Sequence, residues 1–346
     1  MNKKVFLVAG GTGGHLFPAI ALTENKSKIE YFFLLDERTE LIGKKKKLRY
    51  FKIKSSVIRF NLQLPAGLLK ILIGFIQSVL LFMKYKPDLV VGFGGYTSIP
   101  SILAAKILNL KIIIHEQNAI MGRTNRFLSY LTNHIAVTFK KTLHAKKSVI
   151  HTGIPIRKKK NYGAKRDILT KILIVGGSQG AKIFSKVIPK IISELSIKAK
   201  SKILVIQQVK NEDKKRIDQL YKELDIKYVL NEFFDDIYRE YETANIIISR
   251  CGASTLAEIN LFKKFSVLFP LPSAMNNHQY LNAIEFRKSN DCIVVNENNI
   301  DLKYIKNKIE KRIFLNEKSY KLKTNKQDKI KLSLSNLIEK ILIENV

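Results

Sequence analysis

The sequence has little cysteine: its 346 residues include two, Cys251 and Cys292, and no C-x-x-C pair. This excludes a disulfide framework and a cysteine-rich metal site, and it favours a reduced, cytoplasmic compartment. A signal peptide is not expected either. The apolar run at residues 5–8 is too short for the core of such a peptide and predicts a first strand instead.

Acidic side chains are also scarce, since 29 Asp and Glu stand against 61 Lys and Arg and leave a net charge of +32. Most of the positive charge is lysine, whereas proteins that read bases depend on the planar fork of arginine, so no nucleic-acid partner is expected. The charge fits a solvated, lysine-rich surface. It equally fits a protein that meets an anionic membrane surface or a diphosphate-bearing substrate, because the first 157 residues are the poorer in acid.

Two domains are expected, because one ordinary core takes only ~100–150 residues. The same sequence pattern, an apolar run followed by a glycine-rich turn, occurs twice. Residues 4–9 lead into GGTGGH at residues 10–15, and residues 171–175 lead into GGSQG at residues 176–180. Each is a continuous apolar run, typical of a parallel strand buried on both faces, followed by a glycine turn and a helix. Pro18 is expected to open the first of these helices.

Further short apolar runs, separated by helical stretches, predict an α/β fold with a parallel sheet in each half. In the first half these strands are expected at residues 31–35, 88–91, 111–114 and 135–137, and in the second half at residues 202–206, 227–229, 245–248 and 265–269. A charged break at residues 157–163 is the expected linker.

Three glycine turns, the third at residues 92–96, are candidates for phosphate binding. Glycine lets a ligand approach the backbone closely, and the helix that follows presents N–H groups to it. Taken singly, each turn is also consistent with a tight connection that binds nothing. The turns at residues 11–16 and 177–182 match neither G-x-G-x-x-G nor the Walker loop.

Six short motifs, taken together in their order along the chain, are specific enough to indicate a family. They read GGTGGHLFPA (residues 10–19), GFGGYTS (92–98), HEQN (115–118), GGSQGA (176–181), SRCGASTLAE (249–258) and HQYLNA (278–283). Together they resemble the MurG family, which transfers N-acetylglucosamine from UDP-N-acetylglucosamine to lipid I, an undecaprenyl-diphosphate-linked acceptor, and so makes lipid II for peptidoglycan synthesis. The resemblance extends from residue 4 to about residue 283.

The resemblance implies the GT-B architecture, an α/β fold in which two Rossmann-like domains face each other across a cleft. It implies an N-terminal, acceptor- and membrane-facing domain over residues 1–157 and a UDP-N-acetylglucosamine-binding domain over residues 158–330. A last helix at about residues 331–346 would return to the first domain. The implied reaction inverts the anomeric carbon and joins it to the 4-hydroxyl of the acceptor sugar, at the cytoplasmic face of the inner membrane.

Donor-binding roles carry over from the family residue by residue. Glu258 would accept hydrogen bonds from both ribose hydroxyls, because a carboxylate is an acceptor only; the alternative is an ordinary exposed glutamate. Ser178 would reach the diphosphate, and the backbone at Phe234 would read uracil. The full donor set is Asn118, Arg157, Ser178, Phe234, Ala253, Ser254, Thr255, Leu256, Ala257, Glu258 and Gln279.

At the reaction centre, the family pattern places the first glycine loop, with Thr12, Gly13 and Gly14, between donor and acceptor. His15 is the candidate general base, and Glu116 is the second candidate. Either side chain is also consistent with a structural role. The sequence contains no D-x-D pair, so no metal and no cofactor are expected, and helix N-termini would stabilise the diphosphate charge.

The sequence departs from the family in a few places. Ile154 stands where asparagine is usual, and Cys251 replaces a common serine. Another UDP-sugar enzyme on the same scaffold, an epimerase or a glycolipid galactosyltransferase, is the nearest alternative. A non-enzymatic basic protein that binds nucleic acid is the alternative from another class. The blocks of the first half favour the lipid I acceptor over all of these.

Residues 66–83 read AGLLKILIGFIQSVLLFM and form an expected helix ~27 Å long, just enough to cross a bilayer core. A crossing would put the strands at residues 4–9 and 88–91, which belong to one sheet, on opposite sides of the membrane. A helix buried in the domain is another possibility. We expect instead that one face packs on the sheet while part of the remainder enters an anionic membrane interface, with lysines beside it.

Overall fold

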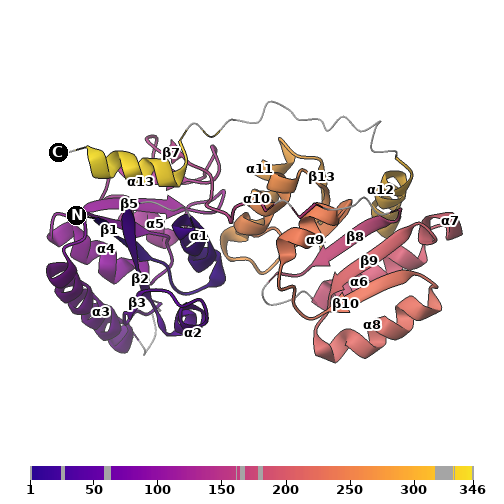
Figure 1. Ribbon diagram of the computed structural model, residues 1–346, viewed down its shortest axis with the longest axis horizontal. Helices are drawn as coiled ribbons and strands as arrows, with labels where there is room; N and C mark the ends of the chain where they lie inside the picture. The colour runs from indigo at the N-terminus through magenta and orange to yellow at the C-terminus, as the bar shows by residue number, and fades with distance from the viewer. Residues whose placement is uncertain are drawn as a thin grey trace. The chain divides into compact units, whose positions relative to one another are not determined.

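The structure, a computed structural model, describes residues 2–24, 28–57, 64–160, 162–163, 168–177, 182–315, 330 and 332–344. These residues form two compact units (Figure 1). The first unit ends at Lys158 and also contains the C-terminal helix, whereas the second unit begins at Lys159. Each unit is described below by itself.

The first unit is built on a parallel sheet whose described strands follow the order β3-β2-β1-β4-β5-β6-β7. These strands are β1 (Lys3–Val8), β2 (Ile29–Leu35), β3 (Tyr50–Lys52), β4 (Leu89–Gly92), β5 (Lys111–Glu116), β6 (His134–Val137) and β7 (Ile150–His151). In the register, Val5 of β1 pairs with Tyr31 on one side and with Leu89 on the other. Strand β4 is buried along its whole length, as expected in a sheet covered on both faces.

Helices cover both faces of this sheet. They are α1 (Gly13–Thr23), α2 (Glu37–Lys45), α3 (Leu64–Tyr85), α4 (Ser98–Ile107), α5 (Arg123–Leu128) and α13 (Leu334–Ile343). On one face, Leu16 of α1 and Ile338 of α13 join Leu7 in a buried core. On the other face, Phe82 of α3 packs edge-on against Phe6. The unit therefore has three layers, and α13 belongs to it although it lies last in the sequence (Figure 1).

The second unit repeats this plan, and its described strands follow the order β10-β9-β8-β11-β12-β13, again all parallel. The strands are β8 (Thr170–Val175), β9 (Ile203–Gln208), β10 (Lys227–Asn231), β11 (Ile246–Ser249), β12 (Phe265–Leu268) and β13 (Cys292–Val294). The helices are α6 (Lys182–Ser193), α7 (Ile197–Lys200), α8 (Asn211–Glu223), α9 (Ile237–Thr243), α10 (Ala253–Phe262), α11 (His278–Arg287) and α12 (Leu302–Phe314), with a 3-10 turn at Met275–Asn277. One buried core lies under α6, α7, α8 and α12, and another under α9, α10 and α11.

The predicted α/β class with two parallel sheets is confirmed. Every strand predicted from the sequence is present, with its ends within two residues of the expected ones. Three strands were not predicted: β3, β7 and β13 have only two or three residues each, too few to show as an apolar run.

The predicted start of the first helix was wrong. Pro18 lies inside α1, which begins at Gly13. Proline has no N–H to donate to the carbonyl of Gly14, so the helix forgoes one hydrogen bond there. His15, which was expected on the first glycine loop, therefore lies in the first turn of α1.

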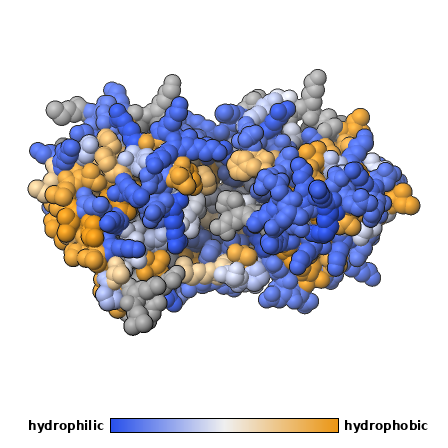
Figure 2. All heavy atoms as spheres, turned by 90° about the horizontal axis from the view of Figure 1, so that it is seen from below, coloured by the Kyte–Doolittle hydropathy of each residue, from blue (hydrophilic) through white to orange (hydrophobic). Residues whose placement is uncertain are grey.

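The buried side of helix α3 holds three small residues, Gly67, Gly74 and Ser78, beside Phe82, and many of its other apolar side chains are exposed. A Cβ on Gly74 would lie 1.8 Å from the Lys54 carbonyl oxygen, so only glycine fits. The hydroxyl of Ser78 donates to the Gly74 carbonyl at 2.8 Å and lies 2.9 Å from the hydroxyl of Ser101 on α4. The exposed side chains of α3 include Leu68, Leu69, Leu72, Ile76, Leu80 and Met83. Figure 2 shows apolar side chains gathered on the first unit where α3 lies.

Candidate functional site

Both sheets place glycine-rich loops where their strand order reverses. The reversal lies between β1 and β4 in the first sheet and between β8 and β11 in the second. In parallel α/β sheets, ligands bind outside the carboxyl ends of the strands at this position. In the first unit residues 9–12 and 93–97 lie there, and in the second unit residues 176–177 and 250–252 do.

Asp36, which follows β2 and caps α2, joins the two glycine loops of the first unit. Its Oδ1 accepts from the Gly11 amide at 3.0 Å and from the Thr39 hydroxyl at 2.7 Å, and its Oδ2 accepts from the Tyr96 hydroxyl at 2.7 Å. Burial alone would raise the pKa of Asp36, but these hydrogen bonds outweigh it and hold the pKa below its usual value. Burial, together with Asp36, raises the pKa of Tyr96 to about 12. A carboxylate therefore holds a neutral phenol.

The half-buried imidazole of His15 lies where three segments meet. A Cβ on Gly95, whose φ is +73°, would lie 3.2 Å from His15 Nε2. The ring therefore rests against the backbone of the glycine loop at residues 93–97, which follows β4. Its Nδ1 lies 3.1 Å from Oε1 of Gln117, just past the end of β5. The first turn of α1, the loop after β4 and the end of β5 thus fix this ring together.

Behind His15, Gln117 and His115 form a buried network. Gln117 Nε2 donates to the Phe93 carbonyl at 2.8 Å and lies 3.2 Å from His115 Nδ1. His115 Nε2 lies 2.8 Å from the Gly153 carbonyl oxygen. Burial lowers the pKa of His115 to about 4, so this histidine is neutral at neutral pH. Gln117 belongs to the HEQN block, but no role was predicted for it.

Glu116, the other candidate base, is 2% exposed and already accepts four hydrogen bonds. Oε1 accepts from the backbone and side-chain amides of Asn118 at 3.0 and 3.2 Å. Oε2 accepts from the Gly122 amide at 3.0 Å and from Nδ2 of Asn125 at 2.8 Å. The geometry suits a carboxylate that shapes residues 116–125 and orients the Asn118 side chain.

In the second unit, helix α10 starts at the reversal point with Gly252 as its N-cap and no side-chain hydrogen bond to that cap. The N–H groups of the first turn, which begins at Ala253, have no partner within a helix and favour an anion. Glu258 lies in the second turn and is half-buried. The helix therefore offers backbone donors at its start and a carboxylate one turn later.

Two glutamines fix the loops around this helix start. Gln279 Oε1 accepts from the Cys251 amide at 3.1 Å and from the Leu271 amide at 3.0 Å, so a ligand would meet its amide nitrogen. At the end of β9, Gln208 Oε1 accepts from the Gly176 amide at 3.0 Å, and its Nε2 donates to the Glu232 carbonyl at 3.2 Å. Gln208 was not predicted; a polar residue at the carboxyl end of a buried strand was its one signal.

The two units divide the predicted site residues. The first unit holds Thr12, Gly13, Gly14, His15, Glu116, Asn118 and Arg157, and the second holds Phe234, Ala253, Ser254, Thr255, Leu256, Ala257, Glu258 and Gln279. Phe234 is half-buried, and its side chain packs against the core under α9 and α10. Ser178 lies outside the described residues.

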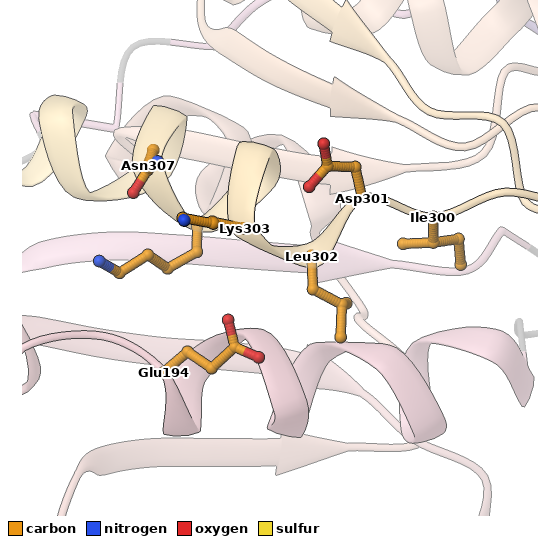
Figure 3. Close-up of a pocket in the computed structure, with 7 residues that line it drawn as sticks. Glu194, Ile300, Asp301, Leu302, Lys303 and Asn307 are labelled. Atoms are coloured by element: carbon orange, nitrogen blue, oxygen red, sulfur yellow. The ribbon is translucent and has the colours of Figure 1, made fainter.

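A surface cavity of about 710 Å³ lies between the end of α6 and the start of α12. Figure 3 shows the carboxylate of Glu194 directed from the α6 side toward α12. The lining residues are Glu194, Ile300, Asp301, Leu302, Lys303, Lys306 and Asn307. None of the predicted site residues lines this cavity, and we assign no ligand to it.

Comparison with known families matches nearly the whole chain. The glycosyltransferase family 28 N-terminal domain matches residues 5–137, and the glycosyltransferase family 28 C-terminal domain matches residues 171–341. A relative from Rickettsia canadensis (strain McKiel) is 38% identical over 98% of this chain and 100% of its own length. That relative is named UDP-N-acetylglucosamine–N-acetylmuramyl-(pentapeptide) pyrophosphoryl-undecaprenol N-acetylglucosamine transferase.

Solved structures agree with the fold. The crystal structure of Acinetobacter baumannii MurG is 26% identical, covers 90% of both chains and superposes with a TM-score of 0.73. The UDP-GlcNAc 2-epimerase from Methanocaldococcus jannaschii covers 98% of this chain and 99% of its own, with a TM-score of 0.63 and 14% identity. At that identity the epimerase shares the fold and carries no argument about the reaction.

Proposed function

The chain belongs to the MurG family within glycosyltransferase family 28, and on this premise we propose that it transfers N-acetylglucosamine from UDP-N-acetylglucosamine to lipid I. The product is lipid II for peptidoglycan synthesis. The observation that carries this function is the 38% identity to a transferase of this name over nearly the full length of both chains. The enzyme is a UDP-N-acetylglucosamine-dependent, inverting hexosyltransferase.

The reaction needs a base for the acceptor 4-hydroxyl, a stabiliser for the departing UDP, and alignment of the two substrates. We assign the base to His15, because its ring is only half-buried, whereas the Glu116 carboxylate already accepts hydrogen bonds at both oxygens. Glu116 then positions Asn118, whose amide is a candidate to hold a sugar hydroxyl. Thr12, Gly13 and Gly14 would line the acceptor side.

The departing UDP would be held by the second unit. The start of α10 would face the diphosphate, Glu258 would accept from the ribose hydroxyls, and the Gln279 nitrogen would donate to the donor sugar. Ser178, Arg157 and the backbone at Phe234 remain proposed donor contacts. Helix N–H groups would serve where other enzymes use a metal, so turnover should persist in EDTA; loss in EDTA with recovery in magnesium would contradict this.

Helix α3 supports peripheral docking on the cytoplasmic face of the cell membrane, where the lipid-linked acceptor would be found. By length and hydropathy it is a helix that could cross a membrane. Only 22% of its apolar window is buried within the protein, so most of this apolar surface is left uncovered by the first unit. It connects β3 to β4, and β4 pairs with β1 in the same sheet, so a crossing would split that sheet. Leu72, Ile76 and Leu80 are 53%, 49% and 62% exposed. Exposed lysines on α3, at positions 70 and 84, add attraction to anionic headgroups of ~1 kcal/mol each.

Docking is tested by co-sedimentation with anionic and neutral vesicles at low and high salt. Leu72→Ser, Ile76→Ser and Leu80→Ser should each weaken binding to anionic vesicles, whereas Ile197→Ser, at an exposed position of α7, should not. Phe75 packs partly against the core and is unsuitable for this series. Binding that only detergent reverses, or no binding at low salt by the folded protein, would refute peripheral docking.

The activity itself is tested with labelled UDP-N-acetylglucosamine and lipid I. Label should move into the lipid fraction only when the acceptor is present. Formation of the C2 epimer of the donor without acceptor, and no labelled lipid, would place the chain with the epimerases instead. Salt-sensitive oligonucleotide binding with no UDP binding would support the non-enzymatic alternative.

A further inference from the structure

The hydrogen bonds of the Gln117 amide are directional and fix which end of the amide faces His15. Its nitrogen donates to the Phe93 carbonyl at 2.8 Å and to the His115 carbonyl at 3.2 Å. Both partners are backbone carbonyls, which only accept. The reversed amide would place its oxygen against two carbonyl oxygens, so the observed orientation is the one that turns the donating end toward these acceptors.

The protonation of His115 supports the same orientation. Its Nε2 faces the Gly153 carbonyl at 2.8 Å and must carry the proton of the neutral ring. Its Nδ1 is then an acceptor, and the Gln117 nitrogen lies 3.2 Å from it. Burial keeps this ring neutral, with a pKa of about 4. The Gln117 nitrogen therefore faces three acceptors, and its oxygen faces His15.

We infer that Gln117 is a positioning residue that holds neutral His15 as the Nδ1–H tautomer. The Gln117 oxygen accepts, so the His15 Nδ1 at 3.1 Å must donate. The lone pair of the neutral ring then lies on Nε2, the nitrogen beside Gly95 in the glycine loop after β4. In the opposite tautomer the lone pair would point into the protein, where no substrate hydroxyl arrives. This inference rests on the proposed role of His15 as base.

Gln117 is 2% exposed and lies behind the imidazole, so it acts through His15 and not on the substrate. Its loss should lower kcat while leaving both substrate KM values nearly unchanged, because ground-state contacts with donor and acceptor stay in place. An effect that passes through His15 also disappears once His15 is removed. A merely structural role would instead lower activity in either background.

The direct test is ¹⁵N NMR of the imidazole nitrogens in the full-length protein, at a pH where the His15 ring is neutral. The His15 signals are identified as those missing from His15→Ala. We expect Nδ1 to be protonated and Nε2 not. The reverse assignment overturns the inference, whatever the kinetics show, and this measurement needs no folded Gln117 variant.

The kinetic test compares Gln117→Met, which keeps the length but removes the amide, with Gln219→Met on the exposed face of α8 as the matched control. Gln117→Met should lower kcat ~10–100-fold in the wild-type background and cause no further loss in His15→Ala. An equal loss in both backgrounds would overturn the inference. Full turnover of His15→Ala would overturn the base assignment itself, and with it the catalytic role of Gln117, without touching the tautomer result.

Discussion

The hydroxyl of Tyr96 donates to Oδ2 of Asp36 at 2.7 Å, and this contact ties the loop after β4 to the end of β2. The other oxygen of Asp36 holds the amide of Gly11 in the first glycine loop. One buried carboxylate thus sets the spacing of both loops that would surround the acceptor. Both contacts are long-range in sequence, since Gly11 lies 25 positions and Tyr96 lies 60 positions from Asp36.

Asp36→Asn should therefore impair use of the acceptor more than binding of the donor. An asparagine that keeps its oxygen toward Gly11 turns an amide nitrogen toward Tyr96, so the Tyr96 hydroxyl can no longer donate there. The charge-assisted hydrogen bonds of the carboxylate are lost, at a cost of ~1–3 kcal/mol in stability. We expect kcat/KM for lipid I to fall ~10-fold or more, with UDP affinity unchanged. The neighbouring exposed Glu37→Gln, which removes the same charge, is the control. Equal losses in the two variants would show that charge alone matters.

Glu258→Ala should weaken UDP binding by ~2–3 kcal/mol in a calorimetric titration, because two ribose hydroxyls would lose a charged acceptor. Glu223→Ala, at an exposed position of α8, removes the same side chain elsewhere in the second unit and should leave the affinity as it is. Unchanged affinity in Glu258→Ala removes this residue from the site.

His15→Ala should lower kcat by ~10²–10⁴, with little change in donor KM, as loss of a general base does. Glu116→Gln should behave differently. It replaces an acceptor by a group with one donating end, so it should lower the melting temperature and raise the KM for substrates that Asn118 holds. A folded Glu116→Gln with unchanged KM and a kcat loss as large as that of His15→Ala would return the base role to Glu116.

The folded protein should lose stability as the pH falls below about 6.5, because burial depresses the pKa of His115 to about 4. Between pH 4 and pH 6.5, His115 binds a proton in the unfolded chain but not in the folded one. The contribution of neutral His115 to the free energy of unfolding is therefore complete above pH 6.5 and declines toward pH 4. At pH 5 the expected loss is about 2 kcal/mol. Denaturant unfolding at pH 7 and pH 5 measures it. His115→Gln should flatten this dependence and His144→Asn, at an exposed position, should not.

Local signals in the sequence were enough for the sheets and the glycine turns. A buried parallel strand such as β8 is a continuous apolar run, and the turn after it needs glycine, so both are visible within ten residues. The edge strand β3, which reads Tyr-Phe-Lys, was missed because three residues at an edge carry no such pattern. Pro18 misled because proline usually opens helices, whereas here α1 tolerates it inside.

The roles of Gln117 and Asp36 could not be predicted, because each depends on groups far away in the chain. Gln117 meets His15 across 102 positions, and Asp36 meets Tyr96 across 60. From the sequence alone, an amide or a carboxylate at a strand end cannot be told from an ordinary surface residue, because its partner is distant in the chain. The family resemblance pointed to the block that contains Gln117, but the physical role came from the two carbonyls that orient its amide.

Helix α13 has a consequence for how the chain is made. Its side chains, among them Leu334 and Leu342, complete the core over β1 and α1, yet they follow the whole second unit in sequence. During synthesis the first sheet, the earliest part to emerge, therefore has one face incompletely covered until the second unit has been translated. The apolar side chains of that face, such as Val5 and Leu7, are exposed to aggregation for that interval. The first unit is thus the first to begin folding and cannot finish before the second has been made.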